Sequence, residues 1–156
     1  MCGIAGAISK IDISSERINQ TLELMKNRGP DGTRSEVITF NNHKIFLLFS
    51  RLSIIDLEPR AMQPFSRGAL KIITNGELYN HRALRVKLEQ VGFHFAGTSD
   101  TEVLLGAIEH YGLKQALDHL VGMYALALWD RQDRQLYLSL IHISEPTRLG
   151  MISYAV

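Results

Sequence analysis

The chain of 156 residues has a single cysteine, no long apolar run and almost no net charge. One thiol cannot form an internal disulfide bond or complete a cysteine-type zinc site. Lysine and arginine total 17 against 16 acidic residues, so a net charge of +1 supplies no basic field for nucleic acid phosphates. No stretch approaches the eighteen or so apolar residues that a bilayer span needs, and the N-terminus lacks the basic flank of a signal peptide. We therefore expect a cytoplasmic protein that binds neither nucleic acid nor membrane.

The composition and the apolar periodicity favour one α+β domain. Hydrophobic residues make up 46% of the chain and charged residues 21%, which excludes disorder. Ser15 and Asn80 are expected as helix N-caps, and Asn75-Gly76 is expected to end a strand in a sharp bend. Two strand pairs joined by short polar turns are expected as antiparallel hairpins. We expect helices over residues 15–27, 81–91 and 98–112, a shorter helix around residue 115, and strands over residues 4–9, 35–40, 44–49, 70–74, 93–96, 123–129 and 135–138.

Cys2 follows directly after the initiator methionine. Methionine is usually removed when the next residue is small, and its removal would give Cys2 a free α-amine. Such an amine has an ordinary pKa of about 7.7–8.0, so it can accept a thiol proton near neutral pH. Nucleophile and base would then belong to one residue. The alternative is an inert, small, buried thiol.

Six short motifs occur in a fixed order along the chain. They are Met1-Cys2-Gly3-Ile4-Ala5-Gly6, Asn27-Arg28-Gly29-Pro30-Asp31-Gly32, Arg51-Leu52-Ser53-Ile54-Ile55-Asp56, Gln63-Pro64-Phe65, Asn75-Gly76-Glu77-Leu78-Tyr79-Asn80 and Ser99-Asp100-Thr101-Glu102-Val103-Leu104-Leu105. This series resembles the N-terminal glutaminase domain of asparagine synthetases, a class II glutamine amidotransferase. The resemblance implies a four-layer αββα sandwich of the N-terminal nucleophile hydrolase type.

The resemblance also implies catalytic roles for three residues. Cys2 would attack the side-chain amide of glutamine, release ammonia and leave a thioester that water hydrolyses to glutamate. The side chain of Asn75 and the backbone N–H of Gly76 would stabilise the tetrahedral oxyanion. The alternative for this pair is an ordinary Asn-Gly turn.

Three charged residues would bind glutamine itself. The resemblance assigns Arg51 to the substrate carboxylate and Asp100, with Glu77 as a weaker candidate, to the substrate ammonium. The alternatives are a surface arginine and a helix N-cap, and Asp100 could cap with one oxygen and bind with the other. Arg28 and Asp31 are expected to hold their own loop in shape.

No metal or other cofactor is expected in this domain, because the six histidines lack metal-ligand spacing. ATP and magnesium would belong to a missing C-terminal synthetase domain. That domain and L-glutamine are the expected partners, and the chain could also form a homodimer.

Two further interpretations of the function stay open. The ammonia acceptor could be a sugar or another carboxylate, and the chain could be a non-catalytic fragment.

The resemblance covers residues 1–137 and then fails. We expect this to be an incomplete, C-terminally truncated domain, because residues 138–156 resemble a translated sequencing-library adapter. The alternative is a divergent C-terminal strand. Missing strands would leave sheet edges and apolar faces exposed, which favours aggregation.

Overall fold

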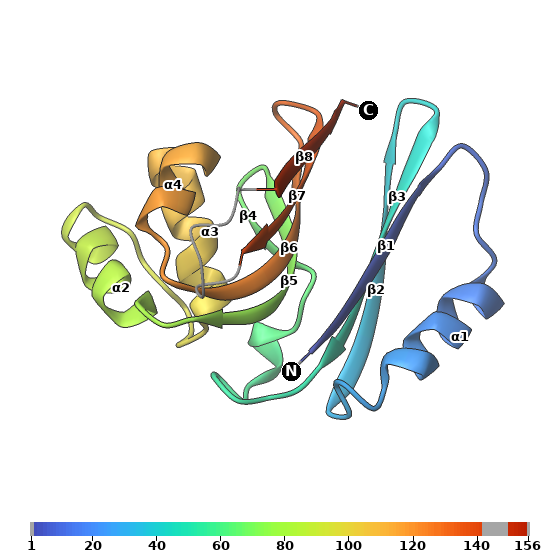
Figure 1. Cartoon of the computed structure of the whole chain (residues 1–156), viewed down its shortest axis with the longest axis horizontal. Coiled ribbons are helices and arrows are strands. Elements are labelled where there is room, and N and C mark those ends of the chain that lie inside the picture. Colours follow the sequence, from blue (N-terminus) through green and yellow to red (C-terminus); the bar gives the residue numbers. More distant parts are fainter. Residues whose placement is uncertain (1, 142–149, 156) are drawn as a thin grey trace.

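The computed structural model describes residues 2–141 and 150–155, which form two antiparallel sheets and several helices (Figure 1). One sheet has the strand order β1–β3–β2, and the other has the order β4–β5–β6–β7–β8. The strands are β1 (Gly3–Ser9), β2 (Gly32–Phe40), β3 (His43–Arg51), β4 (Phe65–Arg67), β5 (Leu70–Leu78), β6 (Gly122–Asp130), β7 (Gln135–Ile141) and β8 (Gly150–Ala155). The helices are α1 (Ser15–Met25), α2 (His81–Gln90), α3 (Asp100–Tyr111), α4 (Leu113–His119) and the 3-10 turn η1 (Pro59–Ala61). The predicted α+β class is confirmed.

The two sheets face one another, and helices lie on their outer sides (Figure 1). Strand β3 packs against other elements on both of its faces, because its apolar run is buried on both sides. Ile45 and Phe49 belong to the core between the sheets, together with Trp129 of β6. Phe46 lies on the opposite face and packs with Leu22 of α1. A larger core lies between the five-stranded sheet and helices α2, α3 and α4.

Most predicted elements are present, with small corrections at two helix starts. Helix α1 is capped by Ser14 and not by Ser15, because the Ser14 hydroxyl accepts the N–H of Arg17 at 3.4 Å. Asn80 does precede α2, but its side chain makes no capping bond. Its amide instead donates to the carbonyl of His119 at 2.8 Å and accepts from the N–H of Val121 at 3.1 Å. Asn80 therefore ties the end of β5 to the start of β6.

The expected strand end at Asn75-Gly76 is wrong. Strand β5 continues to Leu78, since Asn75 pairs with Ala125 and Gly76 pairs with Tyr124 on β6. A Cβ atom on Gly76 would lie 2.1 Å from the carbonyl oxygen of Met123. The glycine therefore permits close approach of two strands and does not form a turn.

The expected strand over residues 93–96 is also wrong. The carboxylate of Glu102 accepts the N–H of Ala96 at 2.7 Å and that of Gly97 at 2.9 Å. The Glu102 side chain therefore accepts the backbone hydrogen bonds that a neighbouring strand would otherwise accept. Phe93 and Phe95 pack against the helical core from this segment.

The boundary expected at residue 138 stays a prediction. Strand β7 runs through this position to Ile141, and β8 pairs with it in antiparallel register. Residues 142–149, which carry much of the adapter-like sequence, lie outside the described part. No helix of the described residues is long and apolar enough to cross a bilayer.

Candidate active site

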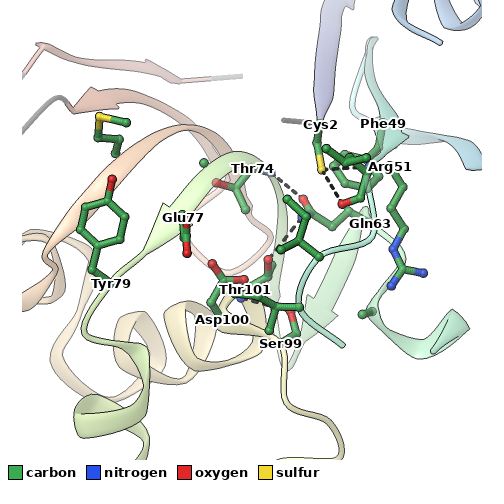
Figure 2. Close-up of a pocket in the computed structure, with 16 residues that line it drawn as sticks. Cys2, Phe49, Arg51, Gln63, Thr74, Glu77, Tyr79, Ser99, Asp100 and Thr101 are labelled. Carbon is green, nitrogen blue, oxygen red and sulfur yellow. Dashed lines mark hydrogen bonds between the residues drawn. The ribbon is translucent and has the colours of Figure 1, made fainter. Parts of the chain in front are cut away.

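A single pocket collects five of the six predicted site residues (Figure 2). The five that line it are Cys2, Arg51, Gly76, Glu77 and Asp100. Figure 2 shows Cys2 and Arg51, from the ends of β1 and β3, opposite Glu77 of β5 and Asp100 of α3. The sixth residue, Asn75, lies beside the pocket, between two lining residues on β5. Residues separated by nearly a hundred positions thus meet where the two sheets end.

Cys2 directly precedes β1 and is partly exposed. Its sulfur accepts the backbone N–H of Leu52 at 3.3 Å, and its thiol faces the carbonyl oxygen of the same residue at 3.6 Å. The two contacts hold the sulfur against the backbone directly after β3. The carbonyl of Cys2 accepts from the guanidinium of Arg28 at 3.2 Å.

The loop between α1 and β2 packs against the end of β3. A Cβ atom on Gly29 would lie 2.2 Å from the Ser50 carbonyl oxygen, so this loop needs a glycine there. The Asp31 carboxylate accepts the N–H of Ser53 at 2.6 Å. The backbone N–H of Asp31 donates to the Arg51 carbonyl at 2.9 Å. Asp31 thus ties its loop to the chain at the end of β3. Arg28 reaches further, because it binds the backbone of Cys2.

Arg51 is buried, with 7% of its surface exposed, so the alternative of a surface arginine is wrong. Its guanidinium donates to the carbonyl oxygen of Asp56. A guanidinium carries five N–H donors, so further donors remain for a carboxylate in the pocket.

Asp100 is the first residue of α3, whereas Ser99 is the N-cap and accepts the N–H of Thr101 at 3.2 Å. One carboxylate oxygen of Asp100 accepts from Thr101 at 2.8 Å, and the other accepts from the N–H of Leu78 at 3.2 Å. The alternative of Asp100 as the N-cap is therefore wrong, and both of its oxygens already accept a hydrogen bond. Each carboxylate oxygen can accept a second hydrogen bond, so the group can still face a cation.

Asn75 is partly buried, and its side-chain oxygen has no hydrogen-bond partner among the described residues. Buried amide oxygens nearly always find a partner in a folded protein. The Asn75 oxygen, beside a residue that lines the pocket, is an exception to this rule.

Comparison with known proteins decides the family. A family model described as a glutamine amidotransferase domain matches residues 1–143. The chain belongs to this glutamine amidotransferase domain family. It is 38% identical over 144 residues to asparagine synthetase [glutamine-hydrolyzing] 1 of Bacillus subtilis, covering 88% of this chain and 22% of that protein. It is 39% identical over 123 residues to the amidase chry2 of Gibberella zeae, covering 78% of this chain and 18% of that protein.

A solved structure agrees with this membership of the amidotransferase family. Glutamine phosphoribosylpyrophosphate amidotransferase from B. subtilis, complexed with ADP and GMP, matches with a TM-score of 0.51 and 25% identity. The match covers 61% of this chain and 23% of that one. The chain spans about a fifth of the length of the curated relatives named above.

Two residues of this amidotransferase domain support the pocket but were given no role from the sequence. Gln63 is buried; its side-chain oxygen accepts the N–H of Thr74 at 2.6 Å, and its nitrogen donates to the hydroxyl of Thr101 at 3.3 Å. It therefore joins β5 to α3 below the pocket. Its position in the Gln63-Pro64-Phe65 motif was the only sequence signal.

Asp56 is the second such residue, and its side chain is only 2% exposed. Burial alone would raise the pKa of this carboxyl, but hydrogen bonds from the backbone of Thr98 and Glu58 and the guanidinium of Arg60 lower the pKa below its ordinary value. The carboxylate is thus held in its charged form inside the protein. It ends the Arg51–Asp56 motif, which alone could have drawn attention to it.

Proposed function

We propose that this domain hydrolyses L-glutamine to glutamate and ammonia, with Cys2 as the nucleophile. The observation that carries the proposal is a partly exposed sulfur at position 2 that shares a pocket with a buried arginine and an aspartate. We further propose that the facing sheets and their outer helices form the αββα layers of N-terminal nucleophile hydrolases.

Removal of Met1 would leave Cys2 with a free α-amine, which acts as the base. The thiol proton moves to this amine as the sulfur attacks the side-chain amide carbon of glutamine. The carbon–nitrogen bond of the tetrahedral adduct then breaks, and the nitrogen leaves as ammonia with the proton that the amine carried. Water attacks the resulting thioester, releases glutamate and returns a proton to the sulfur.

The pocket matches the charges of a free amino acid. The Arg51 guanidinium binds the substrate carboxylate through parallel hydrogen bonds. Asp100 and Glu77 lie across the pocket and bind the substrate ammonium (Figure 2). Opposite charges on the two walls orient the side-chain amide toward Cys2.

Asn75 and Gly76 would stabilise the oxyanion of the tetrahedral adduct. This role needs the N–H donors of the Asn75 side-chain amide, and Asn75 lies on β5 directly before Gly76, which lines the pocket. Loss of one such donor typically costs about 3–4 kcal/mol of barrier.

We propose that the ammonia passes to a separate acceptor domain, which in an asparagine synthetase would use aspartate, ATP and magnesium. The amidase chry2 is similar at nearly the same identity, so an activity other than asparagine synthesis is the second candidate. The acceptor is chosen by residues outside this domain.

The Cys2→Ser variant tests the proposed chemistry. We expect it to lose ammonia release from glutamine by at least about a thousandfold, because a hydroxyl is a much weaker nucleophile than a thiolate. Isothermal titration should show glutamine binding retained, since Arg51 and Asp100 are unchanged. Ammonia release at the wild-type rate would contradict the role of Cys2, and lost binding would contradict the assigned binding residues.

A further inference from the structure

We propose that Asp56 is a positioning residue that sets the distance between Arg51 and Asp100, the two groups assigned to the opposite charges of glutamine. This inference rests on the proposed function. Asp56 does not line the pocket that holds these residues, so it acts through them and not on the substrate.

The first contact of Asp56 is with Arg51. Asp56 has a φ of +52°, a left-handed conformation that few residues other than glycine, asparagine and aspartate adopt readily. In this conformation its carbonyl oxygen accepts the buried guanidinium of Arg51. A single backbone group therefore holds the side chain that is assigned to the substrate carboxylate.

The second contact of Asp56 is with the segment that enters α3. Its carboxylate accepts the N–H of Thr98 at 2.8 Å, two residues before Asp100. The same carboxylate accepts the N–H of Glu58 at 3.3 Å and the guanidinium of Arg60 at 3.2 Å, so it is held on its own side as well. One residue thus binds both walls of the pocket.

Two carboxylates hold the segment over residues 96–98 by its N–H groups. Glu102 accepts from Ala96 and Gly97, and Asp56 accepts from Thr98, so three successive N–H groups end on two buried carboxylates. A Cβ atom on Gly97 would lie 2.1 Å from a carboxylate oxygen of Asp56, which shows how closely the segment approaches.

The separation of Arg51 and Asp100 matters because the carboxylate and the ammonium of an amino acid are attached to one carbon atom. A site that binds both groups must therefore hold its positive and its negative side chain at a fixed separation. Misplacement by about 1 Å can reduce an enzymatic rate about a hundredfold.

The test compares Asp56→Asn with Asp130→Asn. Asparagine keeps the shape of Asp56 and tolerates its φ, but its NH2 cannot accept the hydrogen bonds made by the carboxylate. Asp130 is a matched control, because its carboxylate also accepts two backbone N–H groups, from Gln132 and Asp133. It lies at the opposite end of β6 from the residue that pairs with Gly76.

Three quantities are measured for each folded variant: KM for glutamine, the labelling rate of Cys2 by a glutamine-like diazoketone, and its alkylation rate by iodoacetamide. Iodoacetamide has neither an α-carboxylate nor an α-ammonium, so it reports only the reactivity of the sulfur. For Asp56→Asn we expect KM to rise and diazoketone labelling to fall by about tenfold or more, with alkylation within about twofold of wild type. Asp130→Asn should change none of the three.

The outcomes separate the two proposals. A wild-type protein that releases no ammonia and takes no diazoketone label would overturn the proposed function itself. An active wild type with unchanged KM in Asp56→Asn, or with equal loss of alkylation and labelling, would overturn only the positioning role. If Asp56→Asn does not fold, Asp56→Gly, which also tolerates a positive φ, replaces it. Loss of folding in both would assign Asp56 to stability alone and overturn the inference.

Discussion

At the residue scale, the hydroxyl of Tyr124 is the most unusual polar group below the pocket. The side chain is 5% exposed, and the hydroxyl has no hydrogen-bond partner among the described residues. It borders a small cavity lined by Gly76, Asp100 and Thr101. A buried hydroxyl without a partner costs about 1–3 kcal/mol.

We therefore expect Tyr124→Phe to be neutral or to stabilise the protein by about 1 kcal/mol. Burial raises the pKa of Tyr124 to about 12. In the unfolded chain the group ionises near its ordinary pKa of about 10, so this contribution to stability is present below pH 10 and is lost as the pH rises toward 12. Urea unfolding from pH 8 to 11 should show a shallower alkaline loss in Tyr124→Phe.

Tyr79→Phe is the control, because Tyr79 is 51% exposed. This variant should keep the alkaline loss of the wild type. A Tyr124→Phe protein that is less stable by more than about 1 kcal/mol at neutral pH would show that the hydroxyl has a partner, such as a bound water.

At the element scale, the pairing of β5 with β6 brings Gly76 and Glu77 to the pocket. The backbone of β6 leaves no room for a side chain on Gly76. Gly76→Ala should therefore lower the free energy of unfolding by about 3 kcal/mol, because two backbones and not a flexible side chain must move.

Gly92→Ala is the matched control for this effect. Gly92 has a φ of +95° and nothing within 4 Å of an added Cβ, so only the backbone conformation is penalised. We expect a loss of about 1 kcal/mol there. Denaturant midpoints compare the two variants, and an equal loss in both would contradict close strand contact at Gly76.

Strand β5 and its neighbours show which features could be predicted from the sequence and which could not. Both hairpins were predictable, because apolar residues that cluster on either side of a polar turn are a local signal. The end of β5 was not, since Asn75-Gly76 favours a turn locally and the distant strand β6 decides the outcome. The roles of Asp56 and Gln63 depend on partners 42 and 38 positions away, which local patterns cannot indicate.

At the scale of the whole molecule, the site depends on two sheets that stay in contact. Strand β1 is one of the two outer strands of its sheet among the described residues, and an apolar groove runs between it and β7. Ile8 lines this groove and is 39% exposed. An outer strand with apolar side chains can pair with another chain.

We expect the isolated chain to self-associate through this edge, and Ile8→Lys to reduce light scattering at equal protein concentration. Ile11→Lys is the control, because Ile11 is 77% exposed and lies beyond the end of β1. Equal effects of the two substitutions would indicate that added charge, and not the edge of β1, suppresses association.

In the proposed glutaminase site, Cys2 is the nucleophile once Met1 has been removed. Intact-mass and peptide mass spectrometry after treatment with a glutamine-like diazoketone tests it most directly. We expect a protein without Met1 that carries one label on Cys2, and protection of Cys2 by excess glutamine. A folded protein that retains Met1, or that leaves Cys2 unlabelled, would contradict it.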